Sequence, residues 1–274
     1  MSLNHERVQP ILRVDGLNVE LKIRNKQKKL VENVSFEVEP GQCLGILGES
    51  GSGKTTVIRA ILGLLPGGGK VTAGRITLEG EDLLAYNSEK WRKLRGTDIS
   101  MIFQDSGAMM NPTKKIGSVF TEYILTHEKI SKKEAWNKGI IMLERMRLPA
   151  ADNIMNSYPF QLSGGMRQRV GIAMGMTYQP KLLLADEPTS ALDVTTQAQI
   201  VRQMMQLRDD YNTSIIVVTH NLGVAAYMSD YIIVMKQGII EDQGTREYIL
   251  KESQNEYTRK LLDAVPSLGG ERYV

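Results

Sequence analysis

One segment of eight residues, 48–55 with the sequence GESGSGKT, constrains this chain more than any other. It follows the short apolar run 43–47, which is typical of a strand buried on both faces, and it precedes helical spacing of apolar residues over 55–64. A strand, a glycine-rich loop and a helix in this order form a complete P-loop, in which backbone N–H groups and a helix N-terminus bind phosphate oxygens. A glycine-rich turn with an exposed lysine is the simpler interpretation, and the flanking strand and helix disfavour it. The segment therefore predicts a nucleotide site.

The charged and hydroxyl residues of this loop predict how the nucleotide is held. Lys54 would place its ammonium group against the β- and γ-phosphates, and Thr55 would offer its hydroxyl to Mg²⁺. A P-loop by itself indicates a nucleotide and leaves the reaction open. The residues that we expect at the phosphates are Gly48, Glu49, Ser50, Gly51, Ser52, Gly53, Lys54, Thr55 and Thr56.

Two carboxylates follow an apolar run that is typical of a buried strand, 182–185. At the end of that strand, Asp186 can hold Mg²⁺ through water, and Glu187 points differently and can accept a proton from an attacking water. The alternative is that the pair only caps the next loop, and the presence of the P-loop favours the catalytic interpretation.

Gln104 and His220 also follow predicted strands, 99–103 and 215–219. The carboxyl ends of parallel strands converge on the ligand crevice of such a sheet, so both side chains can reach it. An amide at position 104 can contact both the metal and the water. Each residue alone is weak evidence, because a lone histidine at a strand end is more often structural.

Alternation of strands and helices predicts the fold. Apolar runs at 182–185, 215–218 and 232–235 alternate with helical segments from Thr196 and Leu222, which indicates a mostly parallel sheet with helices on both faces. Alternating apolar residues over 12–21 and 34–38 predict an edge hairpin. Residues 111–180 show helical patterns, with a capping box at Ser131 and Glu134 for a helix that reaches Arg147, and a last helix is expected over 256–264.

We therefore expect one α/β domain over residues 1–274. Its parts are a mostly parallel sheet core in 1–110 and 181–250 with an N-terminal antiparallel β subdomain, an inserted helical subdomain in 111–180, and a C-terminal helix and tail in 251–274.

The composition is that of an ordinary globular protein, with 42% hydrophobic and 24% charged residues. A net charge of +3 is modest and argues against a nucleic-acid partner. The first ten residues are polar and no apolar run approaches the roughly 20 residues that span a bilayer, so any membrane-spanning part is expected on other chains. The single cysteine, Cys43, is expected to be a buried strand residue.

A second anion-binding device lies at Leu162 to Gly165, with the sequence LSGG, followed by a predicted amphipathic helix from Arg169 to Met176. A serine hydroxyl, two glycines and a helix N-terminus suit phosphate oxygens. One chain does not need two such devices for one triphosphate, so this one is predicted to close over the nucleotide bound by another subunit. A glycine hinge before a helix is the alternative.

Together these segments resemble the ATP-binding subunits of ABC transporters over nearly all of residues 11–266. They match that family's P-loop NTPase pattern in order: the P-loop, Gln104, the LSGG signature, the Asp186-Glu187 strand, the D-loop 190–193 and His220. The resemblance implies ATP and Mg²⁺ as cofactors and ATP-driven dimer closure. It further implies Glu187 as general base with His220 and Gln104, metal contacts at Thr55, Gln104 and Asp186, and Ser163, Gly164, Gly165 and Asp193 at the partner's nucleotide.

Further segments resemble the dipeptide, oligopeptide and nickel importer branch. They are 103–105 with 111–112, 157–159, 165–170, 193–199, and 257–266. This resemblance implies a second, different ATPase subunit, two integral-membrane permeases and an extracytoplasmic binding protein, with this chain on the cytoplasmic face of the membrane. The cysteines of a C-terminal iron–sulfur site found in many peptide importers are absent here, so peptides and nickel or metal–chelator complexes both stay open as cargo.

One family feature is missing. The turn 23–29 holds no aromatic residue on which adenine could stack, so adenine is expected on Ile23 or beneath an arginine.

A non-transport ATPase that acts on DNA or the ribosome is the rival function. Residues 111–160 are too few for the long coiled coil of the DNA-acting members, and the ribosome-associated members usually carry two cassettes in one chain.

Overall fold

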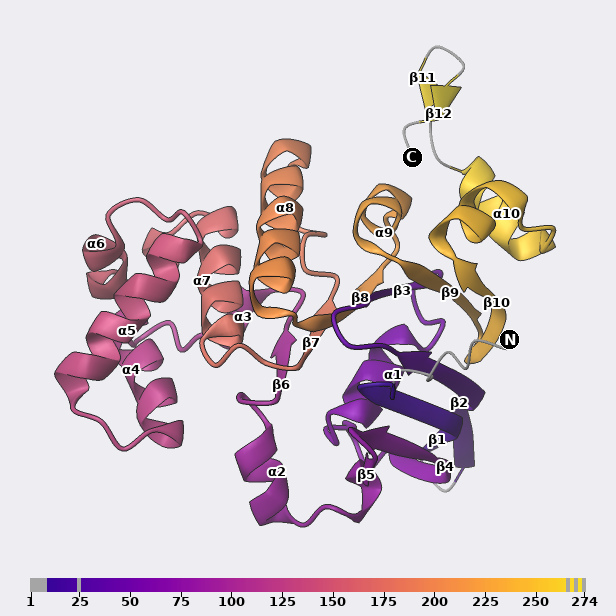
Figure 1. The fold of residues 1–274 in the computed structure, drawn as a ribbon, viewed down its shortest axis with the longest axis horizontal. Helices are drawn as coiled ribbons and strands as arrows, with labels where there is room; N and C mark the ends of the chain where they lie inside the picture. Colours follow the sequence, from indigo (N-terminus) through magenta and orange to yellow (C-terminus); the bar gives the residue numbers. More distant parts are fainter. Residues whose placement is uncertain (1–8, 24–25, 265–266, 269–270, 273–274) are drawn as a thin grey trace, which may run out of the picture.

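A six-stranded sheet forms the centre of the computed structural model, which describes residues 9–23, 26–264, 267–268 and 271–272 (Figure 1). The strand order is β10-β9-β3-β8-β7-β6, and every neighbouring pair is parallel except β10 with β9. This confirms the mostly parallel core. The strands are β3 (Cys43–Leu47), β6 (Ile99–Ile102), β7 (Leu182–Asp186), β8 (Ser214–Thr219), β9 (Tyr231–Lys236) and β10 (Ile239–Thr245).

Both faces of this sheet are covered, and alternate residues of each central strand enter different cores. In β8, Ile215 and Val217 pack with the helices α7 (Gly164–Met176) and α8 (Val194–Tyr211). Ile216 and Val218 pack on the other face, in the core that contains α1 (Lys54–Ile61). Continuous apolar runs therefore mark strands that are buried on both sides, as expected. Cys43 lies fully buried in β3, and this burial raises the pKa of its thiol.

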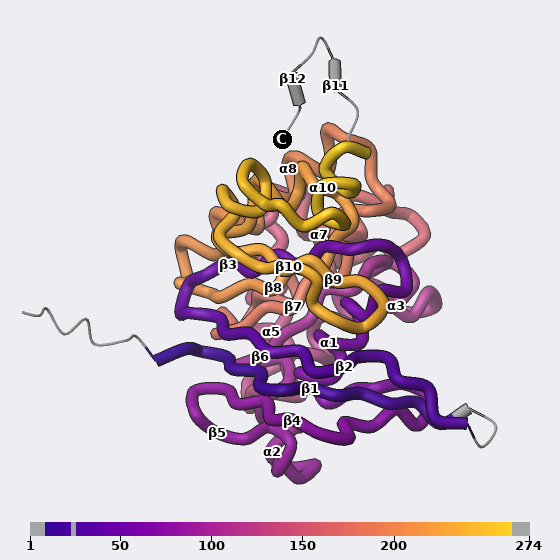
Figure 2. Tube along the Cα trace, turned by 90° about the vertical axis from the view of Figure 1, so that its right-hand side faces the viewer, coloured from indigo at the N-terminus to yellow at the C-terminus, as the bar shows by residue number. Residues whose placement is uncertain are grey.

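A second, antiparallel sheet covers α1 and has the strand order β2-β1-β4-β5. The expected hairpin is present, but it belongs to this separate sheet, and β1 lies between β2 and β4 (Figure 2). The pattern missed β4 because most of its residues are exposed and Gly74 interrupts it. The strands are β1 (Leu12–Ile23), β2 (Lys26–Val38), β4 (Lys70–Leu78) and β5 (Glu81–Asp82), followed by the 3-10 turn η1 (Leu83–Ala85) and α2 (Ser88–Leu94).

The helical subdomain lies to one side of the main sheet in Figure 1. The predicted capping box is present: Ser131 and Glu134 bond each other's backbone at the start of α5, which ends at Arg145, two residues earlier than expected. The signature helix differs more, because it begins at Gly164 instead of Arg169. The elements are α3 (Ser106–Met109), α4 (Ile116–His127), α5 (Lys132–Arg145), α6 (Ala151–Asn156), η2 (Pro159–Gln161) and α7.

The C-terminal elements pack on the outer side of β9. They share a small core with Leu47 at the end of β3. They are α9 (Leu222–Met228), η3 (Tyr248–Glu252) and α10 (Glu256–Asp263). A short antiparallel pair, β11 (Ser267–Leu268) and β12 (Glu271–Arg272), follows α10 in the chain.

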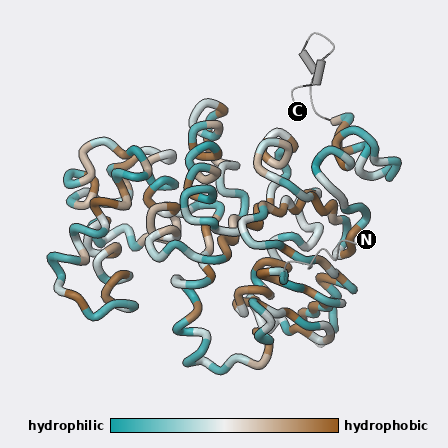
Figure 3. Tube along the Cα trace, in the orientation of Figure 1, coloured by the Kyte–Doolittle hydropathy of each residue, from teal (hydrophilic) through white to brown (hydrophobic). Residues whose placement is uncertain are grey.

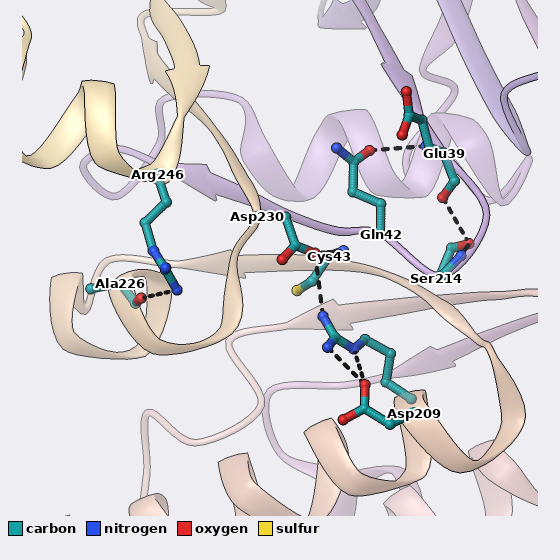
Figure 4. Close-up of polar contacts among 10 residues, drawn as sticks. Glu39, Gln42, Cys43, Asp209, Ser214, Ala226, Asp230 and Arg246 are labelled. Carbon is teal, nitrogen blue, oxygen red and sulfur yellow. Dashed lines mark hydrogen bonds and ion pairs between the residues drawn. The ribbon is translucent and has the colours of Figure 1, made fainter. Parts of the chain in front are cut away.

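Polar contacts tie together the beginnings of the central strands (Figure 4). Asp230, just before β9, accepts a hydrogen bond from the backbone N–H of Cys43 at 2.8 Å and one from Arg208 at 3.2 Å. The Ser214 hydroxyl accepts from the N–H of Gly41 and donates to the carbonyl of Glu39. The amino ends of β3, β8 and β9 are therefore fixed together, which leaves their carboxyl ends for the site.

Apolar residues concentrate in the central strands, and the outer helices alternate polar and apolar positions (Figure 3). Across the described residues, no helix is both long and apolar enough to cross a membrane.

Replacement of Leu44 by Ala should lower the free energy of unfolding by about 2–5 kcal/mol, because the side chain is fully buried in β3 and leaves a cavity. Leu84→Ala, at a side chain that is 42% exposed, is the matched control and should change it by less than about 0.5 kcal/mol. Urea denaturation of both variants measures this. Equal effects would contradict the burial of Leu44 in the core.

Candidate nucleotide site

The P-loop lies between β3 and α1 and has the backbone shape that its glycines predict. Gly48 has φ +150°, and a Cβ there would lie 2.2 Å from the carbonyl oxygen of Met235. Gly51 has φ +81°, and a Cβ there would have no atom within 4 Å. Gly48 thus allows close packing against β9, whereas Gly51 faces open space. An open concave loop of this kind can receive a phosphate.

The beginning of α1 is free to bind an anion. Its N-cap residue, Gly53, provides no side chain to cap the helix, and the first turn contains no acidic residue. Backbone N–H groups and the positive end of the helix dipole therefore point to the loop without a competing carboxylate. Thr55 and Thr56, both half-buried, continue this first turn.

Lys54 is the central cation of the site. Its side chain is 4% exposed, and its Nζ donates hydrogen bonds to the carbonyls of Gly48 at 2.8 Å and Glu49 at 2.7 Å. Burial lowers the pKa of Lys54, and the negative charges of Glu187 and Asp186 oppose that shift. The side chain therefore bends back over the loop, where a bound phosphate could also contact the amine. Glu49 and Ser50 are exposed at the rim, and Ser52 is buried beneath it.

Asp186 and Thr55 meet at the end of β7. Thr55 Oγ1 donates to Asp186 Oδ1 at 2.8 Å, and Asp186 is almost fully buried. Burial raises the pKa of Asp186, and the hydrogen bond from Thr55 opposes this. Within the described part of the chain, no group of three His, Cys, Asp or Glu side chains could hold a metal alone. The donor set fits Mg²⁺ bound with a nucleotide, since Mg²⁺ typically takes one or two protein ligands together with phosphate oxygens and water.

Glu187 is held between two other predicted residues. Its Oε1 lies 3.0 Å from His220 Nδ1, and Gln104 Nε2 donates to its Oε2 at 3.3 Å. The Glu187 backbone has φ +45°, and its N–H donates to the carbonyl of Val218 at 2.8 Å. This uncommon left-handed conformation turns Glu187 away from the direction of Asp186. Residues from β6, β7 and β8 therefore meet at one edge of the sheet.

The LSGG signature forms a second, separate hollow. Ser163 caps α7 by accepting the N–H of Met166 at 3.3 Å, and this cap explains why the helix begins at Gly164. Asp193 caps α8 in the same way through the N–H of Thr196 at 2.9 Å. The two caps face the same hollow, which no P-loop residue lines. Its lining residues are Ser163, Gly164, Gly165, Met166, Arg169, Ala191, Leu192, Asp193 and Thr196.

Sequence analysis did not identify Arg169 or the turn after β9. Arg169 lies one helical turn after Gly165 and lines the same hollow, so its i+4 spacing was the available signal. Gly238, in the turn after β9, donates its N–H to the carbonyl of Ser52 at 2.9 Å, and no local pattern reveals this contact. The proposed adenine contacts at the β1–β2 turn fall on the side chain of Ile23 and on Arg24, outside the described residues.

Comparisons with known proteins agree with this geometry. The sequence model of the ABC transporter family matches residues 31–190. The oligopeptide transport ATP-binding protein OppD of Bacillus subtilis is 42% identical over 263 residues, which cover 96% of this chain and 74% of that protein. The dipeptide transport ATP-binding protein DppD of Lactococcus lactis is 41% identical over 261 residues, covering 95% and 75%. OppD of Escherichia coli is 39% identical over 98% of this chain and 80% of its own length.

Solved structures give the same result. The ATP-binding cassette MJ0796, described as a dimer in a post-hydrolysis state with ADP and phosphate, superposes with a TM-score of 0.77 at 26% identity, over 86% of this chain and 98% of that one. The fold also matches cbiO1 from Clostridium perfringens, with a TM-score of 0.75 at 24% identity, over 94% and 96% of the two chains. With a complete P-loop, the carboxylate pair and the signature in place, this chain belongs to the ABC transporter family and is an ATPase of that family.

Proposed function

We propose that this chain hydrolyses ATP to power the uptake of peptides through a membrane transporter. The observation that carries the proposal is the similarity to dipeptide and oligopeptide transport ATP-binding proteins at 39–42% identity over 95–98% of the chain. Nickel or a metal–chelator complex is the alternative cargo that the resemblance leaves open. The modest net charge of +3 supports an assignment without a nucleic-acid partner.

In the proposed mechanism, Glu187 is the general base. Its carboxylate follows the end of β7, directly after Asp186, where it could accept a proton from a water that attacks the γ-phosphate. Gln104 and His220 orient it through hydrogen bonds at 3.3 and 3.0 Å. His220 is largely exposed, so it is free to contact the γ-phosphate as well. The remaining catalytic contribution is charge stabilisation by Lys54 and the loop N–H groups.

Thr55, Asp186 and Gln104 would hold Mg²⁺. Bound there, the ion neutralises charge on the β- and γ-phosphate oxygens. The hydrogen bond between Thr55 and Asp186 keeps the two oxygens adjacent at 2.8 Å, which preorganises the ligands.

The hollow lined by Ser163, Gly164, Gly165 and Asp193 is proposed to bind the nucleotide of a second ABC ATPase subunit. Two phosphate-binding devices in a chain with one P-loop support this arrangement, as does the dimeric state of the similar cassette MJ0796. The partner is proposed to be a different ATPase chain, so that the functional unit is a heterodimer with two composite sites.

The membrane components are proposed to be two permeases and an extracytoplasmic binding protein, with this chain peripheral on the cytoplasmic face. The helical subdomain, residues 111–180, and the Gln104 loop would contact the permeases. An apolar hollow beside that loop supports this, since it is lined by Phe103, Met109, Met110 and Val119 together with residues of α7. The sheet core in 1–110 and 181–250 and the C-terminal segment 251–274 would form the rest of one cassette.

Cargo can be tested with the assembled transporter in liposomes. ATP hydrolysis is measured with the binding protein added alone, with a mixture of short peptides, or with a nickel–chelator complex. Peptides should raise the hydrolysis rate several-fold, and the nickel complex should leave it at the basal level. Stimulation by the nickel complex alone would overturn the peptide assignment.

Glu187→Gln should preserve ATP binding and lower turnover by about 10²–10⁴-fold, because it removes the base and keeps the shape of the side chain. The measurement is steady-state hydrolysis by a complex in which the partner ATPase is also inactivated. Glu144→Gln, at an exposed position of α5, is the control and should match wild type. Turnover near the wild-type rate would remove Glu187 from this role.

Ser163→Arg should reduce turnover of the complex by at least 10-fold and leave the ATP affinity of the isolated chain unchanged. A bulky side chain in the hollow blocks closure on the partner, while the P-loop is untouched. Nucleotide titration of the isolated chain, beside hydrolysis by the complex, measures the two effects. Ser88→Arg, on exposed α2, is the matched control. Loss of ATP binding in the isolated Ser163 variant would mean that the signature acts on its own chain's nucleotide.

A further inference from the structure

The C-terminal helix α10 reaches the P-loop through one side chain. The hydroxyl oxygen of Tyr257 accepts a hydrogen bond from the backbone N–H of Glu49 at 3.3 Å, across 208 positions of sequence. Glu49 is the second residue of the P-loop, and its carbonyl also accepts a hydrogen bond from Lys54. The peptide groups on both sides of Glu49 Cα are therefore fixed, one by α10 and one by the central cation of the site.

Tyr257 is held firmly enough to act as a support. Its side chain is only 9% exposed and packs in the small core that includes Leu47, the residue that directly precedes the P-loop. The ammonium group of Lys236, at the end of β9, lies 4.7 Å from the centre of its ring. Packing in this core and the contact with Lys236 hold the ring beside the P-loop, where its hydroxyl reaches Glu49.

A polar cluster fixes α10 to β10 and thereby positions Tyr257 relative to the P-loop. The Thr258 hydroxyl donates to Asp242 at 2.9 Å, and the Ser253 hydroxyl donates to the same carboxylate oxygen. Asn255 caps the helix by accepting the N–H groups of Tyr257 and Thr258, and its amide donates to the carbonyl of Glu241 at 2.9 Å. In Figure 1, α10 accordingly lies beside β9 and β10.

Tyr257 contacts the beginning of the P-loop, at the end that joins β3. Gly238 in the β9–β10 turn holds the carbonyl of Ser52, near the exit into α1, and Tyr257 holds the N–H of Glu49 near β3. A loop that binds phosphate through backbone N–H groups gains affinity when its conformation is fixed before the ligand arrives. Neither contact touches Glu187, so the support affects nucleotide binding more than the chemical step.

We propose that Tyr257 is a positioning residue for the P-loop, and that docking of α10 on β10 sets the affinity of this chain for MgATP through it. The proposal rests on the assignment of the P-loop as the nucleotide site. It predicts that Tyr257→Phe binds MgATP about 2- to 10-fold more weakly, the factor that the net contribution of one hydrogen bond gives. In the assembled complex, the KM for ATP should rise by the same factor, and kcat should stay within twofold of wild type.

Two further variants separate positioning from general destabilisation. Thr258→Val removes the hydrogen bond to Asp242 and leaves Tyr257 unchanged, so it should weaken MgATP binding in the same direction. When Thr258→Val is added to Tyr257→Phe, it should weaken MgATP binding little further, because the docking of α10 acts through the Tyr257 hydroxyl. Tyr248→Phe, at a tyrosine 40% exposed in the preceding turn, is the matched control and should bind like wild type.

MgATP titration of the full-length chain and its four variants, including the double one, measures these effects, with thermal denaturation of each without nucleotide. Unchanged affinity in Tyr257→Phe, a fall in kcat without a rise in KM, or additive effects of the two substitutions would overturn the proposal. If wild type itself failed to bind MgATP, the proposed nucleotide site would fail. If wild type binds and Tyr257→Phe binds equally well, only the role of Tyr257 fails.

Discussion

The buried ammonium group of Lys54 is the interaction on which the nucleotide site depends. A buried cation is costly unless it is paired or hydrogen-bonded, and here the carbonyls of Gly48 and Glu49 satisfy it. These hydrogen bonds turn the carbonyls of Gly48 and Glu49 toward the amine. Burial destabilises the charged form of Lys54, so a triphosphate is a strongly favoured partner for it. The loop and the cation are thus prepared for an anion before one binds.

The parallel sheet positions the other polar residues of the nucleotide site. The parallel strands end at one side of the sheet, where polar side chains can face an open site. Gln104, Asp186, Glu187 and His220 occupy such positions after or at the ends of β6, β7 and β8. Hydrogen bonds join three of them around Glu187. At the opposite end of the strands, polar contacts centred on Asp230 fix β9 to β3 and to α8.

Structural features that depend on local sequence patterns could be predicted. The P-loop, the buried strands and the capping box at Ser131 each depend on residues within a few positions of one another, and the structure contains all three. The strand β4 was missed because most of its residues are exposed, so the apolar alternation is too short to detect. The beginning of α7 was placed late because its first residues are glycines, and only the cap by Ser163 starts the helix there. The bond from Glu49 to Tyr257 joins segments that no local rule connects.

The proposed dependence on a partner subunit rests on the separation of the P-loop from the signature hollow. Beside the P-loop, Lys54 bonds to loop carbonyls and Thr55 bonds to Asp186. Glu187 forms a separate group with Gln104 and His220, and no signature residue takes part in these contacts. Ser163, two glycines and Arg169 line the signature hollow, and Asp193 carries the one carboxylate among its lining residues. That carboxylate caps α8, and the N–H of Thr196 lowers its pKa. A carboxylate held in its charged form and committed to a helix cap is a poor proton acceptor. This separation is why we propose that two chains facing each other complete both sites.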